Sequence, residues 1–236
     1  ELLDSPVSPR GFRLLARVPR LPEVVNERLV GHFGGLQKLL AASIDDLLEG
    51  ALIISRYRYP DLDEQKVKAR LASIRQDIWL ELNDNLTAFE KVRVFNHIFF
   101  QVHGFKGNKR NYHAPQNSYI NEVLDSRTGN PLSLAIIYQV LAEDLGLPLR
   151  GVNLPNHFVL AYLDEETMGG ADSGQQAEEN VLFYVNAFSQ GDILGRNEIN
   201  EFLEKLKIEY TKAGKLEDAL TVSEELKKLA ALASDN

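Results

Sequence analysis

Basic and aromatic side chains gather in the loop from Gly104 to Pro115, which is the one local concentration of positive charge in the sequence. Such side chains can hold a phosphate or a carboxylate. A short polar loop rich in Gly and Asn also needs no ligand to explain it, and we favour this simpler interpretation of a solvated connection. The side chains concerned are His103, Lys106, Lys109, Arg110, Tyr112 and His113.

Cysteine is absent from all 236 residues, so disulfide bonds, thiolate metal ligands and a thiol nucleophile are excluded. Four histidines show no i,i+4 pairing and no adjacent carboxylates of the kind that bind metals; they are His32, His97, His103 and His113. The glycine motifs of phosphate-binding and dinucleotide-binding loops do not occur. We therefore expect no metal and no cofactor.

The charge balance limits the partners of this protein. Its 26 basic and 34 acidic residues give a net charge of −8, whereas nucleic acids and anionic membranes select for excess Lys and Arg. No apolar run approaches the ~18 residues of a membrane span, and no signal-peptide pattern opens the chain. We expect a cytoplasmic protein whose unknown partner is a protein or peptide rather than nucleic acid or a membrane.

The segment from Asn130 to Pro148 is apolar on nearly every helical face and is sharply bounded at both ends. Asn130 is typical of an N-cap and Pro131 of a first helical turn. Gly146 is typical of a left-handed helix stop, and Pro148 prevents the helix from resuming. The pattern predicts a buried central helix with Leu134, Ala135, Ile137, Tyr138, Leu141, Ala142 and Leu145 in the core.

The residues on either side of this helix predict further elements. Residues 149–163 indicate a strand pair or a strand broken near Pro155, and residues 181–188 a third strand. The acidic, Gly-rich segment 164–180 between them predicts a long mobile connection. Earlier in the chain, helices are expected to end before Tyr59 and to span 64–82 and 88–102, the last opened by a capping box from Thr87 to Glu90.

Shorter helices are expected near the central helix and at the C-terminus. Asn117 and Ser118 are expected to cap a short helix through Leu124, and Asn197 to cap a helix running to about residue 212. A last helix is expected to end near residue 232. The turn at 213–220 resembles that of a tetratricopeptide repeat, so we expect a terminal helical hairpin docked on the core.

Four ordered motifs, at residues 112–124, 127–134, 151–158 and 184–188, resemble the bacterial YchA/SirB-type branch of the transglutaminase-like superfamily. The resemblance runs from about residue 48 to about residue 206. It implies an α+β fold: a mostly helical N-terminal half, a transglutaminase-like core of a central helix packed on a small antiparallel sheet, and a C-terminal helical hairpin. We divide the chain into an arm or linker (1–20), a helical part (21–125), the core (126–195, including 164–180) and the C-terminal helices (196–236).

The resemblance also implies where chemistry would occur. In active members a Cys at the start of the central helix is the nucleophile, a strand His activates it, and an Asp or Asn on the next strand orients the imidazole. Here the matching positions are Pro131, His157 and Asn186. Proline has no nucleophile, and a neutral Asn stabilises an imidazolium less than a carboxylate does. Each polar residue also has an ordinary structural explanation, as a satisfied strand histidine and a strand-end turn residue.

Two functions remain open on this basis. One is a binding or regulatory module that keeps the fold without catalysis, with a cleft between the central helix and the His157 strand; its candidate binding residues are Tyr112, Asn117, Asn130, Pro131, Asn153 and Asn156. The other is a serine-type acyl hydrolase or transferase that uses Ser133, His157 and Asn186. Ser133 lies about 200° around the helix from Pro131, and a local hydrogen bond at the helix start explains it more simply. We favour the binding module.

Overall fold

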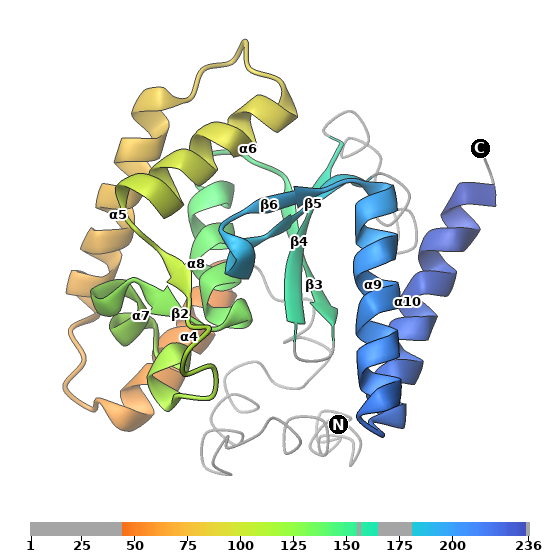
Figure 1. Ribbon diagram of the computed structural model, residues 1–236. Coiled ribbons are helices and arrows are strands. Elements are labelled where there is room, and N and C mark those ends of the chain that lie inside the picture. Colours follow the sequence, from red (N-terminus) through yellow and green to blue (C-terminus); the bar gives the residue numbers. More distant parts are fainter. Residues whose placement is uncertain (1–43, 155–156, 165–180, 235–236) are drawn as a thin grey trace, which may run out of the picture.

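The computed structural model describes residues 44–154, 157–164 and 181–234. A four-stranded antiparallel sheet has helices on both of its faces (Figure 1). This arrangement confirms the predicted α+β class with a helix-rich first half. The predicted arm at 1–20 and the predicted mobile segment at 165–180 lie outside the described residues.

The described chain begins with three helices, α4 (Ile44–Arg58), α5 (Glu64–Glu81) and α6 (Ala88–Asn96). A carboxylate oxygen of Asp63 accepts a bond from the Lys66 backbone N–H at 3.2 Å and so caps α5. The predicted capping box from Thr87 to Glu90 is present at the start of α6. These caps are local features of the chain, which is why the sequence placed both helix starts correctly.

The predicted helix at 88–102 begins as an α-helix and continues as a π-helix. After α6 the chain continues as the π-helical turn η1 (His97–Val102), in which three consecutive side chains, Ile98, Phe99 and Phe100, are all buried. Because successive side chains point in different directions around the helix axis, three buried in a row mean that η1 is enclosed on more than one side.

A small parallel pair, β1 (Lys106–Gly107) with β2 (Thr128–Gly129), brackets the 3-10 turn η2 (Pro115–Ser118) and helix α7 (Ile120–Ser126). The prediction that Asn117 and Ser118 cap this helix is wrong. Tyr119 occupies the N-cap and makes no side-chain cap bond. Asn117 is buried and bonds to the preceding loop instead, so its side chain is not available to α7.

The predicted central helix is α8 (Pro131–Glu143), and it is buried as expected. Asn130 is its N-cap and Pro131 its first residue. Gly146 has the predicted positive φ, 72°, just beyond the helix end. All the predicted core residues are buried except Leu145, which is only half-buried because it follows the last helical turn.

The sheet consists of β3 (Leu149–Leu154), β4 (His157–Leu163), β5 (Val181–Asn186) and β6 (Asp192–Leu194), in that order. The first three strands confirm the predicted strand pair and third strand. The third strand ends at Asn186 rather than at 188, because the chain turns there into the 3-10 helix η5 (Ala187–Ser189). Sequence reasoning missed β6, which is too short to show a period-2 pattern.

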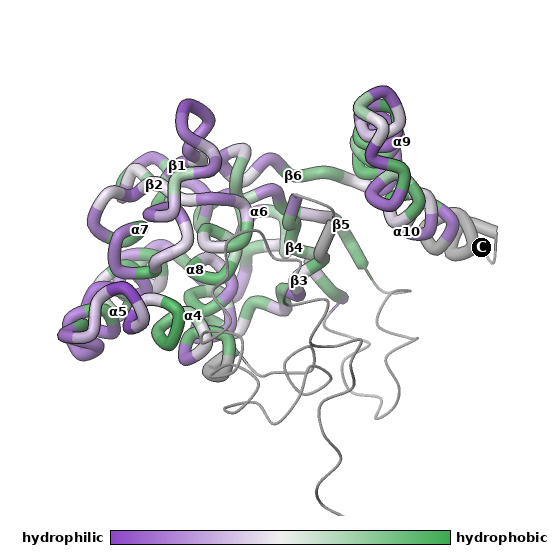
Figure 2. Tube along the Cα trace, turned by 90° about the horizontal axis from the view of Figure 1, so that it is seen from below, coloured by the Kyte–Doolittle hydropathy of each residue, from purple (hydrophilic) through white to green (hydrophobic). Residues whose placement is uncertain are grey.

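The two faces of the sheet pack against different partners. On β4, Phe158, Leu160 and Tyr162 join the main hydrophobic cluster, which also contains α8 and residues of α4 to α7. Val159 and Ala161 face the other way and join a second cluster with α9 (Arg196–Lys212) and α10 (Leu216–Ser234). Figure 2 shows the resulting hydrophobic colour along α8 and the strands. The expected C-terminal hairpin is therefore present, although its first helix is capped at Gly195 rather than at Asn197.

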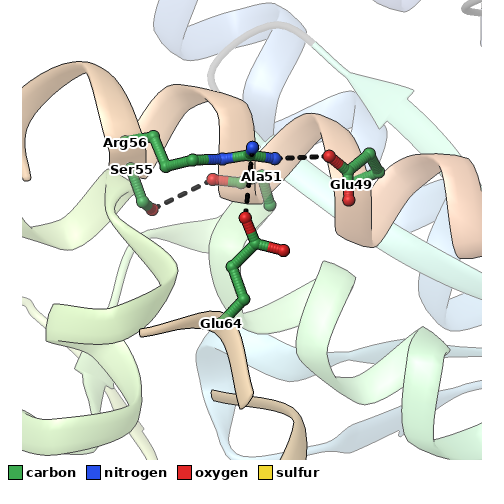
Figure 3. A network of polar contacts seen from close by, with 5 residues as sticks. All are labelled: Glu49, Ala51, Ser55, Arg56 and Glu64. Atoms are coloured by element: carbon green, nitrogen blue, oxygen red, sulfur yellow. Dashed lines mark hydrogen bonds and ion pairs between the residues drawn. The ribbon is translucent and has the colours of Figure 1, made fainter. Parts of the chain in front are cut away.

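Ser55 joins α4 to α7 through a buried hydroxyl. Its Oγ donates a hydrogen bond to the Ala51 carbonyl oxygen at 2.9 Å and accepts one from the Ile120 N–H at 2.9 Å. Figure 3 shows the first of these bonds beside Arg56, which bridges Glu49 and Glu64. Because Ile120 is the first residue of α7, its N–H has no partner within that helix. The Ser55 hydroxyl supplies the acceptor that this N–H requires.

We expect Ser55→Ala to lower the free energy of unfolding by about 1–3 kcal/mol, because it leaves the buried Ile120 N–H without an acceptor. Urea unfolding followed by circular dichroism measures the change. Ser73→Ala, at an exposed site in the middle of α5, is the matched control and should change stability little. Equal effects of the two substitutions would contradict the role assigned to the Ser55 hydroxyl.

Candidate functional site

The start of α8 is closed by a reciprocal pair of hydrogen bonds. Asn130 Oδ1 accepts from the Ser133 N–H at 2.8 Å, and Ser133 Oγ accepts from the Asn130 N–H at 3.1 Å. Ser133 Oγ also lies 3.3 Å from the Asn130 carbonyl oxygen, to which it donates. Pro131, at the first helical position, is buried and has no N–H. Ser133 is thus a capping residue. This is the local hydrogen-bonding role that the sequence favoured over a catalytic one.

His157 begins β4 and lies on the face of the sheet opposite α8. Its ring meets Phe202 of α9 edge to face, with 5.5 Å between ring centroids. It follows the alternation of Val159 and Ala161, which pack against α9. Burial lowers the pKa of the His157 imidazole, and the nearby Glu209 carboxylate opposes this shift. The neutral ring is therefore the form that its surroundings favour.

Asn186 ends β5 and is buried. Its Oδ1 accepts a bond from the Ser189 N–H at 3.3 Å and so caps η5. The structure therefore does not bring the three candidate catalytic residues into contact. Ser133 bonds within the α8 cap, Asn186 bonds within its own turn, and His157 packs against Phe202 across the sheet from α8.

The lowered pKa of His157 predicts an acid-sensitive contribution to stability. The unfolded chain binds a proton at His157 near pH 6.5, whereas the folded chain resists protonation until the pH is lower. This contribution is present above pH ~6.5 and is lost as the pH falls from there through the folded pKa. We expect His157→Phe, which keeps an aromatic contact with Phe202, to reduce the loss of stability on acidification. Urea unfolding at several pH values measures it.

The same substitution at exposed His113 is the control for this experiment. His113→Phe keeps His157 and should therefore keep its acid-side loss of stability. If His157→Phe leaves the pH dependence of the unfolding free energy unchanged, the assigned burial of the imidazole is wrong.

Four of the six candidate binding residues lie together around the start of α8. Asn117 Nδ2 donates to the carbonyl oxygens of Asn111 and Tyr112 at 2.8 and 2.9 Å, and the Asn117 carbonyl oxygen accepts from the Asn130 N–H at 3.4 Å. The Tyr112 ring packs edge to face on Phe188 of η5, with centroids 5.6 Å apart. Pro131 adjoins Asn130. Asn117 thus holds the loop 104–115 against α8, and its amide hydrogens are both used in doing so.

The remaining two candidates lie at the β3–β4 turn. The backbone of Asn153 pairs with Phe158 in the hairpin, while the Asn153 side chain and all of Asn156 lie outside the described part of the chain. No described side chain at this turn tests the predicted cleft between α8 and the His157 strand, so the cleft stays a prediction. Among the described residues, no group of three or more His, Asp or Glu side chains is placed to hold a metal.

Sequence reasoning missed a groove on the helical side of the molecule. It has a volume of about 440 Å³ and lies between the α4–α5 connection, the first turns of α5, and α7. Its lining combines cations, carboxylates and apolar side chains from segments that are far apart in the sequence. A charged turn, from Arg58 to Asp63, was the one local signal for it. None of the described helices is long and apolar enough to cross a membrane.

A family model described as "Transglutaminase-like superfamily" matches residues 65–229. The chain belongs to the transglutaminase-like superfamily. The match covers most of the helical half, the whole sheet and most of the C-terminal hairpin, and it confirms the resemblance at the level of the superfamily.

Its relatives include proteins of quite different lengths. A UPF0162 protein of Xylella fastidiosa is 38% identical over 123 residues, which are 50% of this chain and 44% of that protein. The F-box only protein 21 of Mus musculus is 28% identical over 169 residues, 62% of this chain and 26% of that protein. This superfamily member thus spans less than half the length of these curated relatives.

A third similarity is short and strong. The DNA integrity scanning protein DisA of Streptomyces griseus is 81% identical over 47 residues, which are 20% of this chain and 13% of DisA. Because the overlap is so short, the role named for DisA is not assigned to this chain. No solved structure matches this chain.

Proposed function

We propose that this protein is a non-catalytic member of the transglutaminase-like superfamily that acts by binding a protein or peptide. The observation that carries the proposal is the start of α8, where Ser133 is bonded into the helix cap and Pro131 occupies the position that the resemblance assigns to the family's Cys. With cysteine absent from the sequence, the nucleophile of the active members has no counterpart here.

The helix start also has fewer of the N–H donors that such chemistry uses. A helix N-terminus can stabilise a thiolate or an oxyanion through its unpaired N–H groups and its dipole. Here Pro131 has removed one N–H, and the Ser133 N–H is bonded to Asn130 Oδ1. The site therefore has fewer free donors for a developing negative charge than an uncapped helix start would have.

The candidate base is equally poorly placed for acyl transfer. A serine hydroxyl becomes a useful nucleophile when a base within hydrogen-bonding distance takes its proton. His157 lies across the sheet from α8, and the Asn186 amide that would orient its ring is bonded to Ser189 instead. This geometry gives no support to the alternative of a serine-type hydrolase or transferase.

We further place the chain in the YchA/SirB-type branch, and we infer that the α9–α10 hairpin is tetratricopeptide-like. The order of the four motifs and the similarity to the UPF0162 protein support the first assignment. The tight turn at Gly214, with φ 71°, supports the second. Paired helices of this kind present surfaces to other proteins, in keeping with a binding role.

The test of this function combines labelling with substrate screening. The protein is treated with a broad serine-reactive phosphonate and is assayed with ester, thioester and glutamine–amine substrates. We expect no labelling of Ser133 and no turnover above that of Ser133→Ala. Labelling at Ser133 that His157→Ala abolishes, together with turnover that both substitutions remove, would establish the enzyme and overturn the proposal.

A further inference from the structure

The loop 104–115 carries positive charge without any acidic residue of its own. Residues 104–118 include Lys106, Lys109 and Arg110 but no Asp or Glu. All three side chains are exposed, and none of them forms an ion pair within the described part of the chain. The loop is therefore a positive surface in a chain whose net charge is −8.

Buried hydrogen bonds hold the segment 108–112 in one shape. Asn117 is 3% exposed, and its Oδ1 accepts a bond from Asn108 Nδ2 at 2.9 Å, in addition to the two bonds that Asn117 Nδ2 donates to loop carbonyl oxygens. Asn108 Oδ1 in turn accepts from the Asn111 N–H at 2.9 Å. These bonds enclose the backbone that carries Lys109 and Arg110. A partner that binds there does not have to order this backbone, which lowers the entropy cost of binding.

The start of the loop is fixed to β2, which lies beside α7 and α8 (Figure 1). The Lys106 N–H donates to the Arg127 carbonyl oxygen at 2.9 Å, and the Asn108 N–H donates to the Gly129 carbonyl oxygen at 2.9 Å. Between them, Gly107 has no room for a side chain, because a Cβ there would lie 2.6 Å from the Phe188 ring of η5. One side of the loop thus packs on the protein, and its exposed cations are left to the solvent.

The carboxylates of neighbouring elements are mostly engaged elsewhere. On α7, Glu122 hydrogen-bonds to the α4–α5 connection and Asp125 forms an ion pair with α5, so both are directed toward α4 and α5. Asp77 Oδ2 lies 3.0 Å from His103 Nε2. Asp192 of β6, which follows η5, has no ion pair among the described residues and offsets one of the three positive charges. The local balance therefore stays positive and favours an anionic partner.

The number of cations decides between two kinds of anionic partner. Nucleic-acid binding gains its affinity by releasing counterions from many phosphates, about 6–10 in well-studied cases. Three cations in one loop do not supply that number, and the rest of the chain is more acidic than the whole and repels a long polyanion. A short acidic segment of a protein needs two or three contacts and touches the loop alone.

We propose that the loop 104–115 is the docking surface for an acidic segment of a partner protein, whose carboxylates pair with Lys106, Lys109 and Arg110. The planar Arg110 guanidinium can hold a carboxylate through two parallel hydrogen bonds, while the two lysines act as point charges. Exposed ion pairs are individually weak, so the loop steers and orients the partner more than it sets the affinity. The inference rests on the proposed binding function and names the surface and the partner chemistry for it.

The test titrates three ligands into the full chain labelled with nitrogen-15: N-acetyl-Asp-Glu-Asp-Glu-Asp-Glu amide, its uncharged counterpart N-acetyl-Asn-Gln-Asn-Gln-Asn-Gln amide, and hexathymidylate. We expect the acidic peptide to shift backbone amide signals within residues 106–113, and the uncharged peptide to leave them unshifted. The shifts should vanish at about 0.5 M salt, because salt screens exposed charges. No shifts with the acidic peptide, equal shifts with the uncharged peptide, shifts confined to other surfaces, or tighter binding of hexathymidylate would each overturn the assignment.

Variants identify the cations that the peptide uses. Lys106→Gln, Lys109→Gln and Arg110→Gln should each weaken the acidic peptide by roughly twofold to fivefold, the range for exposed charge pairs, and the triple variant should abolish the shifts. Lys212→Gln, which removes an exposed cation at the end of α9, is the matched control and should leave the affinity unchanged. Circular dichroism confirms that each variant keeps the fold. If Lys212→Gln weakens the peptide as much as the loop variants do, the peptide responds to overall charge and the assignment is wrong.

The outcomes for the two proposals remain distinguishable. An inactive protein that does not respond to the acidic peptide loses the docking surface and keeps the non-catalytic function. Turnover that depends on Ser133 and His157 overturns the function even if the peptide binds. Unchanged affinity in the triple variant would show that the peptide does not use the proposed contacts.

Discussion

Replacing Phe99 by alanine is expected to lower the free energy of unfolding by about 3–5 kcal/mol, because a fully buried aromatic ring is lost and a cavity remains. The Phe99 ring is 0% exposed and stacks on Phe105 with centroids 4.3 Å apart. Its edge meets Phe100 at 4.9 Å and Tyr138 at 5.5 Å. Because aromatic rings surround Phe99 on several sides, the core cannot easily relax to fill the cavity that Phe99→Ala leaves.

Phe89→Ala is the matched control for this substitution. Phe89 lies in the first turn of α6 and is 47% exposed, with one edge contact to Phe183 at 6.2 Å. Its loss should cost about 1 kcal/mol or less. Denaturant unfolding of the two variants gives the comparison, and a Phe99→Ala effect no larger than that of Phe89→Ala would remove Phe99 from the centre of the core.

Gly191→Ala is expected to be damaging for two separate reasons. Gly191 has φ 77°, a region that costs a residue with a Cβ about 1–2 kcal/mol. A Cβ there would also lie 2.2 Å from Asn96 Oδ1, within the side chain that links this turn to α8. Asn96 Nδ2 donates to the Gly191 carbonyl oxygen at 2.8 Å, and its Oδ1 accepts from the Tyr138 hydroxyl at 2.9 Å.

Displacing Asn96 would leave the Tyr138 hydroxyl without this acceptor in the core. Burial raises the pKa of the Tyr138 phenol well above its ordinary value, so the hydroxyl stays protonated and requires an acceptor. An unmet buried group adds about 1–3 kcal/mol to the strain, and we expect a total loss of about 2–5 kcal/mol. Thermal and denaturant unfolding measure this loss.

Gly146→Ala separates the two causes. Gly146 has nearly the same φ, 72°, but no atom lies within 4 Å of the position that its Cβ would take. This variant should therefore show the backbone strain alone, about 1–2 kcal/mol. If Gly191→Ala costs no more than Gly146→Ala, the bonds through Asn96 do not contribute as the structure indicates.

The elements that the sequence predicted best are those fixed by local chemistry. The caps at Asn130 and Thr87 and the stop at Gly146 all depend on neighbouring residues. The start of α7 was misplaced because Asn117 satisfies its hydrogen bonds in the preceding loop, a tertiary choice that the local pattern does not reveal.

The candidate site was harder to predict for the same reason. Strand alternation shows that His157 and Phe158 point to opposite faces, but not which face α8 covers. That choice is made when Phe158, Leu160 and Tyr162 join the main cluster. The groove depends in turn on α7 lying against the start of α5, and no local pattern in either segment records that contact.

The main hydrophobic cluster determines which parts of the chain fold together. It joins Leu52, Val92 and Phe95 of the helical half to Leu141 of α8 and Val185 of the sheet. Neither the helical half nor the sheet can bury α8 without the other, so these parts must fold and open together as one cooperative unit. The α9–α10 hairpin, whose own cluster lies across the sheet, is free of this constraint and is the part that can detach first.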